Sequence, residues 1–197
     1  MADVSTMSNV TPITKPIANI VRVDVITEED IPQAYSLTDV YSEAEATAHV
    51  SEGEEDAVRV RNTIHAQNNF EDIVLGYDVR LLSVLMVPEI LALIDGGEWD
   101  ALNEEYSAPP IGVPVERIPL TLHVFTEEKD ASGSTVGYVQ FIYEHCKGTP
   151  VDYTWQDGEF FTPEMVVKSR PKTGKRPAGF KLLDELPPLP GDDGGTV

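Results

Sequence analysis

The stretch at residues 72–86, DIVLGYDVRLLSVLM, decides the fold class because its apolar side chains recur at every second position. Asp78 and Arg80 occupy the alternate positions. The stretch is also too rich in β-branched residues to favour a helix. It predicts one long strand that bends near Gly76. The residues that share the apolar parity are Ile73, Leu75, Tyr77, Val79 and Leu81.

The next stretch, PEILALID at residues 88–95, has helix signals at both ends. Pro88 is suited to the first helical position, and the pair Gly96-Gly97 can end the helix. A short helix is therefore predicted. Its apolar side chains, Ile90, Leu91, Leu93 and Ile94, are expected to cover a sheet.

Further strands are predicted on both sides of this pair. Residues 20–26, IVRVDVI, alternate and end before Pro32. Residues 120–126 and 136–144 flank an acidic loop at 127–134 and predict a hairpin, and residues 160–168 predict a further strand.

Residues 44–50 and 58–66 also alternate, and SEGEED at 51–56 lies between them. Because Gly53 permits a chain reversal, a hairpin with an acidic tip is predicted. The first of its two strands has an alternative. Ser42 with Glu45 three residues later could be a capping box that opens an alanine-rich helix.

These elements predict a mainly β fold, a β-sandwich or half-open barrel with one short flanking α-helix. Residues 1–19 are expected to form a flexible N-terminal arm, residues 20–186 a single β-rich domain, and residues 187–197 a disordered Pro/Gly/Asp tail. Neither a signal peptide nor an apolar run of membrane-spanning length is seen.

The net charge of −20 over 197 residues argues against binding of nucleic acid by the surface as a whole. The single cysteine, Cys146, cannot form an internal disulfide. The simplest interpretation is a protein made in an aqueous, reducing cytoplasm.

No catalytic or cofactor motif emerges, and the chain is expected not to be an enzyme. The four histidines are scattered singly, so no metal site is predicted. His145 and Cys146 would point to opposite faces of a strand, which is poor geometry for a catalytic couple. The acidic pairs Glu54-Glu55 and Asp24 with Glu28 are interpreted as solvated charges, because a general acid with a raised pKa needs apolar surroundings.

The charges are strongly segregated along the chain. Residues 27–56 carry ten acidic side chains and no lysine or arginine, whereas residues 168–181 carry only basic charges. Opposite potentials of this kind can steer and register contacts between copies, although each stretch could equally be a solvated loop. The candidate contact residues in these two stretches are Glu52, Glu54, Glu55, Asp56, Lys168, Arg170, Lys172, Lys175 and Arg176.

One order of motifs suggests a family. VRVRN at 58–62 leads to GYD at 76–78, followed by PEILALIDGG at 88–97, GYVQFIYEHCKGTPV at 137–151, QDGEFFTPEMVVKSRPKTGKRP at 156–177 and LLDELP at 182–187. This order resembles the tail tube proteins, or major tail proteins, of tailed bacteriophages that infect Gram-positive bacteria. The resemblance covers about residues 58–187.

The resemblance implies a virion structural protein that forms hexameric rings stacked into a tube for DNA ejection. It implies as partners further copies of the chain, other tail proteins and DNA that passes without specific binding, with no cofactor and no membrane. The resemblance also implies an acidic lumen, which gives passing DNA no counterion-release gain and which the candidate contact residues could line instead of contacting another subunit. Arg59, Arg61 and Arg80 depart from this pattern and would have to be paired or turned away from the channel.

The alternative function is a β-sandwich binding module that recognises a carbohydrate or receptor on a virion or cell surface. Such a module needs an exposed aromatic platform. The candidate side chains, Trp99, Tyr153, Trp155, Phe160 and Phe161, show no regular spacing. A hydrolase with two carboxylates is the least favoured class.

Overall fold

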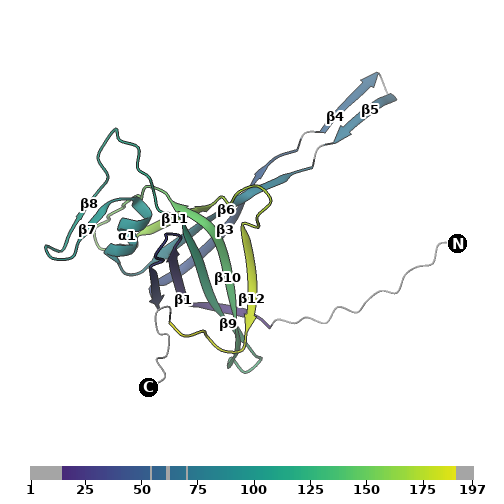
Figure 1. The fold of residues 1–197 in the computed structure, drawn as a ribbon. Helices are drawn as coiled ribbons and strands as arrows, with labels where there is room; N and C mark the ends of the chain where they lie inside the picture. Colours follow the sequence, from purple (N-terminus) through teal and green to yellow (C-terminus); the bar gives the residue numbers. More distant parts are fainter. Residues whose placement is uncertain (1–14, 54, 61–62, 70, 190–197) are drawn as a thin grey trace.

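The computed structural model describes residues 15–53, 55–60, 63–69 and 71–189, and of 55–60 and 63–69 only the backbone is considered. An antiparallel sheet forms most of the protein, as Figure 1 shows. Its elements in chain order are β1 (Ile17–Thr27), β2 (Ala34–Thr38), β3 (Tyr41–Ser51), β4 (Glu55–Val60), β5 (Thr63–Asn69), β6 (Ile73–Ser83), α1 (Pro88–Asp95), β7 (Glu98–Asp100), β8 (Glu105–Ser107), β9 (Leu120–Lys129), β10 (Thr135–Gly148), β11 (Glu164–Ser169) and β12 (Ala178–Leu183).

The main sheet runs in the order β2-β1-β9-β10-β11-β6-β3, and β12 pairs with β10. On one side, strand β10 pairs with two different strands. Its residues 138–143 pair with β12, and its residues 146–148 pair with β11. Between these parts, His145 has a positive φ of 51° and the register with β9 shifts. The sheet curls until β3 contacts β1, but no ladder joins these two strands. The prediction of a mainly β, half-open architecture with one short helix is confirmed.

The core lies inside this curl. Strand β6 shows the expected alternation, since Val79 and Leu81 are buried and Arg80 between them faces outward. The other strands add apolar side chains from the same inner face, which include Val23, Val25, Leu122, Val124, Met165 and Val167.

Helix α1 packs against the sheet as its sequence predicts. Ile90, Leu91 and Ile94 are buried, whereas Leu93 is only partly covered. Gly96 ends the helix in the left-handed region at φ 83°, and its N–H donates to the Ala92 carbonyl at 2.8 Å.

Strand β10 meets helix α1 closely at Gly148. A Cβ atom at Gly148 would lie 2.0 Å from the carbonyl oxygen of Ile94, so this position needs a residue without a side chain.

The predicted hairpin between residues 44–50 and 58–66 is wrong. Strand β3 pairs with β6, and β4 pairs with β5. Ser51 of SEGEED is the last residue of β3 and Glu55 the first of β4, so SEGEED connects these strands instead of forming a hairpin tip. Residues 58–66 are divided between β4 and β5. The small side chains of Ala44 and Ala46 lie opposite Leu81 and Val79, which gives β3 its partner. The alternative prediction, a helix that begins near Ser42, is also wrong, because Tyr41–Ser51 form strand β3.

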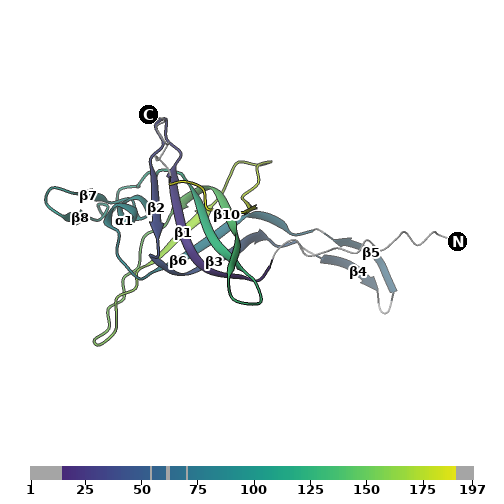
Figure 2. The ribbon, with the colours of Figure 1, turned by 90° about the horizontal axis from the view of Figure 1, so that it is seen from below.

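Figures 1 and 2 show β4 and β5 projecting from the body beyond the ends of β3 and β6. We call the ladder of β4 and β5, with the ends of β3 and β6 that lead into it, the arm. The arm root is the group of exposed apolar side chains where it leaves the body, namely Val50, Ile73, Val74 and Leu75.

Several strands are not evident from the sequence pattern: β2, β7, β8 and β12. Strand β11 begins at Glu164, after Pro163, and so is shorter at its start than predicted. The hairpin of β9 and β10 is confirmed.

The predicted terminal segments are only partly described. Residues 1–14 and 190–197 lie outside the described residues, so the predictions for these two segments stay predictions. Residues 17–19 of the predicted N-terminal arm belong to strand β1, where Ile17 and Ala18 pair with β9. The Pro187 carbonyl, at the start of the predicted tail, accepts a hydrogen bond of 2.8 Å from Arg22 Nη1. The described chain has no helix of the length and apolarity needed to span a membrane.

Candidate functional site

The outer surface of β3, β6 and β11 is charged, and Arg80 lies at its centre. The guanidinium forms a two-point contact with Glu164, with Nε–Oε1 at 2.7 Å and Nη2–Oε2 at 2.9 Å. From the other side, Glu43 approaches Nη1 to 3.0 Å and Glu45 to 3.8 Å. The hydrogen bonds with Glu164 raise the pKa of Arg80 and lower the pKa of Glu164. We call this surface the charged face.

The basic stretch at residues 168–181 begins at the end of β11, beside Asp78 of the charged face. Lys168 on β11 lies opposite Asp78 on β6. Arg170 forms an ion pair with Asp78, and its Nη1 donates to the Tyr77 carbonyl at 3.0 Å. Arg170 is therefore already engaged within its own chain.

The remaining candidate residues lie elsewhere. Lys172, Lys175 and Arg176 belong to the loop between β11 and β12, where the Lys175 N–H donates to the Lys172 carbonyl at 3.0 Å. Glu52 is exposed just after β3. Glu55 and Asp56 begin β4, and Glu54 lies outside the described residues. The proposed contact between the acidic and basic groups of different copies stays a prediction.

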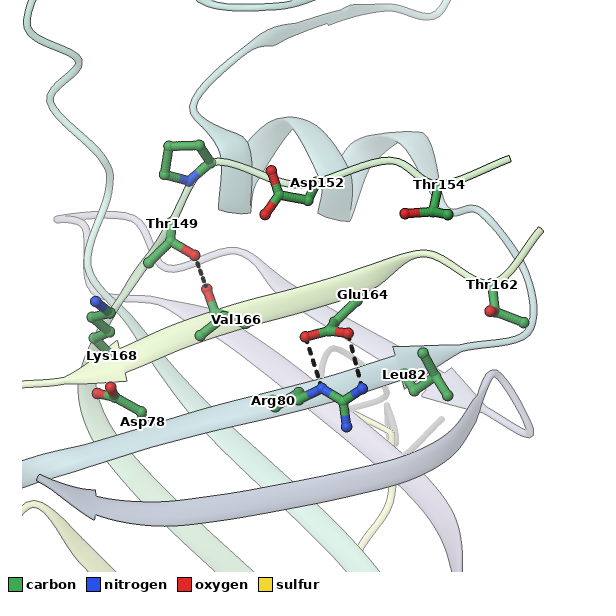
Figure 3. Close-up of a pocket in the computed structure, with 11 residues that line it drawn as sticks. Asp78, Arg80, Leu82, Thr149, Asp152, Thr154, Thr162, Glu164, Val166 and Lys168 are labelled. Atoms are coloured by element: carbon green, nitrogen blue, oxygen red, sulfur yellow. Dashed lines mark hydrogen bonds and ion pairs between the residues drawn. The ribbon is translucent and has the colours of Figure 1, made fainter. Parts of the chain in front are cut away.

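A cavity of about 620 Å³ opens between the charged face and the segment after β10. Figure 3 shows Asp152 and Thr154 facing Glu164 and Arg80 across it. The lining is mostly polar, and acidic and basic groups alternate in it. This arrangement can bind a complementary charged or hydrogen-bonding surface.

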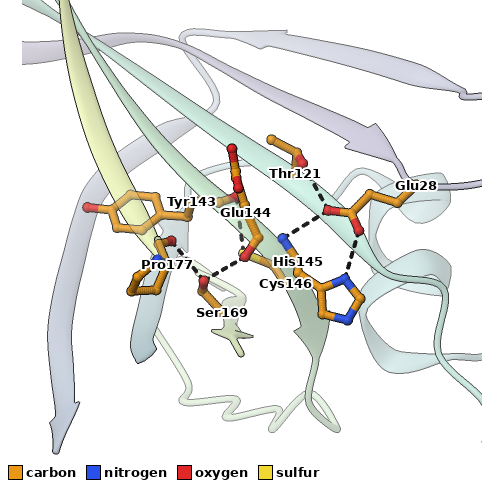
Figure 4. Close-up of polar contacts among 8 residues, drawn as sticks. All are labelled: Glu28, Thr121, Tyr143, Glu144, His145, Cys146, Ser169 and Pro177. Carbon is orange, nitrogen blue, oxygen red and sulfur yellow. Dashed lines mark hydrogen bonds and ion pairs between the residues drawn. The ribbon is translucent and has the colours of Figure 1, made fainter. Parts of the chain in front are cut away.

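His145 and Cys146 have separate surroundings, as Figure 4 shows. Glu28 accepts a hydrogen bond from the His145 backbone N–H at 2.9 Å, and the same carboxylate contacts Nδ1 at 2.8 Å. The Cys146 thiol is buried, and burial raises its pKa to about 12. The imidazole therefore contacts Glu28 and not the thiol. The thiol stays protonated, and a protonated thiol is a poor nucleophile.

The carboxylates considered as an acid–base pair also have separate partners. The interpretation of Asp24 as a solvated charge is wrong, because Asp24 is buried. Its carboxylate forms an ion pair with Arg22 at 3.1 Å and accepts from Ser36 Oγ at 2.6 Å. Glu28 is engaged by His145, as described above. In the part of the chain that the structure describes, no cluster of His, Cys, Asp and Glu side chains could hold a metal ion.

Sequence reasoning missed one grouping of aromatic rings. In the loop between β10 and β11, the rings of Tyr153, Trp155 and Phe161 contact one another. The irregular spacing of the aromatic residues in the sequence does not predict these contacts. The spacing of Tyr153 and Trp155 around polar Thr154 is a short alternation that could have indicated a shared face.

No protein-family model matches the chain, and no curated protein matches it. Among solved structures, the chain is similar to one in the "Cryo-EM structure of the anti-feeding prophage (AFP) baseplate, 6-fold symmetrised", with 14% identity and a TM-score of 0.41. The match covers 87% of this chain and 97% of that chain.

Proposed function

We propose that this chain is a structural virion protein that assembles into hexameric rings, stacked as a phage tail tube for DNA ejection. The observation that carries the proposal is the arm. At its root, Val50, Ile73, Val74 and Leu75 are between 37% and 63% exposed. A two-stranded hairpin is at best marginally stable alone in water, and exposed apolar strands favour pairing with another chain.

Open sheet edges support the same proposal. Strands β2 and β3 end the main sheet, and each has one neighbour in it. Strand β12 pairs only with β10 within the described chain. Joining such edges around a ring removes unpaired backbone groups. The order of motifs that resembles tail tube proteins is a further, independent support.

The charge of the chain is compatible with a DNA conduit. A net charge of −20 disfavours adhesion of DNA to the wall. Arg80, one of the three arginines that depart from the family pattern, contacts three carboxylates. Its positive charge is therefore compensated within the chain.

The test is electron microscopy of the purified full-length chain at high concentration, with tail assembly partners and over a range of salt. We expect rings or tubes. The variant Ile73→Ser/Leu75→Ser removes apolar surface from the arm root and should stay folded but lose assembly. The matched control is Leu102→Ser/Ile111→Ser, which changes two exposed apolar side chains in loops outside the arm and should assemble normally.

A wild-type chain that stays monomeric under all of these conditions would contradict the proposal. Normal tubes from the arm-root variant would show that the arm is not the assembly element.

A further inference from the structure

The loop between β10 and β11, residues 149–163, carries the aromatic side chains Tyr153, Trp155, Phe160 and Phe161. In Figure 2 it extends from the body as a yellow-green protrusion. A turn closes its end, where the Glu159 N–H donates to the Gln156 carbonyl at 3.2 Å. Two extended segments of chain therefore run side by side toward this turn.

Three of the rings lie nearly parallel to one another. The centroid separations are 5.6 Å for Tyr153 and Trp155, 5.8 Å for Trp155 and Phe161, and 6.2 Å for Tyr153 and Phe161. The angles between the ring planes are 7°, 15° and 19° for the same pairs. In a single column the outermost rings would be about twice as far apart as adjacent ones. Nearly equal separations mean instead that the rings spread sideways and form a broad aromatic surface.

One end of this surface is fixed and the other is open. Tyr153 packs against the hydrophobic core, so its ring is held in place. Trp155 is 73% exposed. Phe160 is 98% exposed, and it is the one aromatic ring described in this loop that contacts none of the others. The exposed indole therefore belongs to a supported surface and is not simply a mobile side chain.

The polar groups near this surface limit its ligand. Gln156, Asp157 and Glu159 form the turn next to Trp155, and Gln156 Nε2 donates to Glu159 Oε1 at 3.1 Å. The bases of a nucleic acid could stack on aromatic rings, but the acidic side chains beside these rings repel nucleic acid and other polyanions. Amide and carboxylate groups hydrogen-bond well to neutral hydroxyls. A flat apolar surface with a few such groups at its edge suits a sugar ring, which has a flat C–H face and a rim of hydroxyls.

We infer that Tyr153, Trp155 and Phe161 form a binding platform for neutral carbohydrate, with Gln156, Asp157 and Glu159 available to its hydroxyls. This inference does not depend on the proposed tube function, because the platform is complete within one chain. It adds to the assembly proposal a surface that can hold the virion to a polysaccharide.

The test is isothermal titration calorimetry of the unassembled full-length chain with cellohexaose, laminarihexaose and chitohexaose, and with polygalacturonate as an anionic comparison. At least one neutral hexasaccharide should bind, and polygalacturonate should not. Trp155→Ala should weaken binding at least about tenfold, and Trp155→Phe should retain part of it. Because Trp155 is largely exposed, both variants should keep the wild-type circular dichroism spectrum.

Phe160→Ala is the matched control, since it removes an exposed aromatic ring of the same loop that lies outside the platform. It should bind as the wild type does. The inference is overturned if none of the neutral hexasaccharides binds at millimolar concentration, or if Trp155→Ala binds unchanged. It is also overturned if sugars do not bind and Trp155→Ala alters the oligomeric state, because the surface would then be a protein contact. Failure of tube formation would leave this result unaffected.

Discussion

Strands β3 and β6 pass through two different environments, because apolar side chains of both strands are buried in the body and exposed at the arm root. In the body, Val79 and Leu81 of β6 are 1% and 0% exposed. At the arm root, Ile73, Val74 and Leu75 of the same strand are exposed, although β3 still pairs with β6 opposite Ile73 and Val74. The ladder thus continues where the core has ended. Backbone pairing sets the path of a strand, whereas burial requires a further layer, which the described residues of a single chain do not supply at the arm root.

The largest effect is expected from the buried ion pair of the body. Arg22→Met leaves the buried Asp24 carboxylate without its cation, which should cost about 3–5 kcal/mol of unfolding free energy. Urea unfolding followed by circular dichroism measures this loss. The double variant Arg22→Met/Asp24→Leu should recover much of it. A single variant as stable as the wild type would show that the body tolerates a lone buried charge.

Two leucines of β6 provide the direct comparison. Leu81→Ala removes a fully buried side chain and should lower the unfolding free energy by about 2–5 kcal/mol. Leu75→Ala, at the arm root, should change it by less than about 0.5 kcal/mol. Equal losses in urea unfolding would mean that the arm root is part of the folding core after all.

The C-terminal segment gives a smaller effect. Deleting residues 190–197 should leave stability unchanged. Deleting residues 187–197 also removes the Pro187 carbonyl that accepts from the buried Arg22, which should cost about 1–3 kcal/mol. Thermal unfolding of the two truncations locates the boundary of the tail. If the longer deletion is also neutral, the whole tail from residue 187 is dispensable, as the composition predicts.

A weaker, pH-dependent contribution is expected from Glu28 and His145. Burial alone would raise the pKa of Glu28, but hydrogen bonds from His145 and Thr121 hold it below its ordinary value of 4.5. Because the pKa of Glu28 is lower in the folded than in the unfolded chain, ionised Glu28 stabilises the fold at any pH above about 4.5. This stabilisation is lost as the pH falls below 4.5 toward the lowered pKa of the folded state. Glu28→Gln should therefore cost less than about 1 kcal/mol at pH 7, and the difference from wild type should shrink below pH ~4.5. A constant difference between pH 7 and pH 3 would contradict this assignment.

The smallest effect on folding is expected from the acidic residues after β3. Replacing Glu52, Glu54 and Glu55 with Gln and Asp56 with Asn should change the unfolding free energy by less than about 0.5 kcal/mol. We expect impaired stacking of rings, partly restored when the charges at residues 168–176 are also reversed. Tube length and DNA ejection should be measured separately. Normal tubes with slow ejection would place these acids at the lumen and contradict the stacking hypothesis.

Local signals in the sequence are sufficient to predict several elements of this fold. The alternation of residues 72–86 predicted β6, and Pro88 and Gly96 marked the limits of helix α1, because side-chain periodicity and backbone dihedral preferences act over a few residues. The same reasoning predicted the mainly β class and the hairpin of β9 and β10. The charge segregation was also evident, but it could not indicate that Arg170 is paired with Asp78.

Strand pairing and the contacts between distant side chains depend on tertiary packing. Two alternating stretches at 44–50 and 58–66 looked like partners, yet β3 pairs with β6. Alternation defines the faces of a strand and not its neighbour, and the neighbour depends on core packing between residues far apart in the chain. For the same reason Tyr153 and Trp155 could not be joined to Phe161 until the turn at residues 156–159 brought the two segments together.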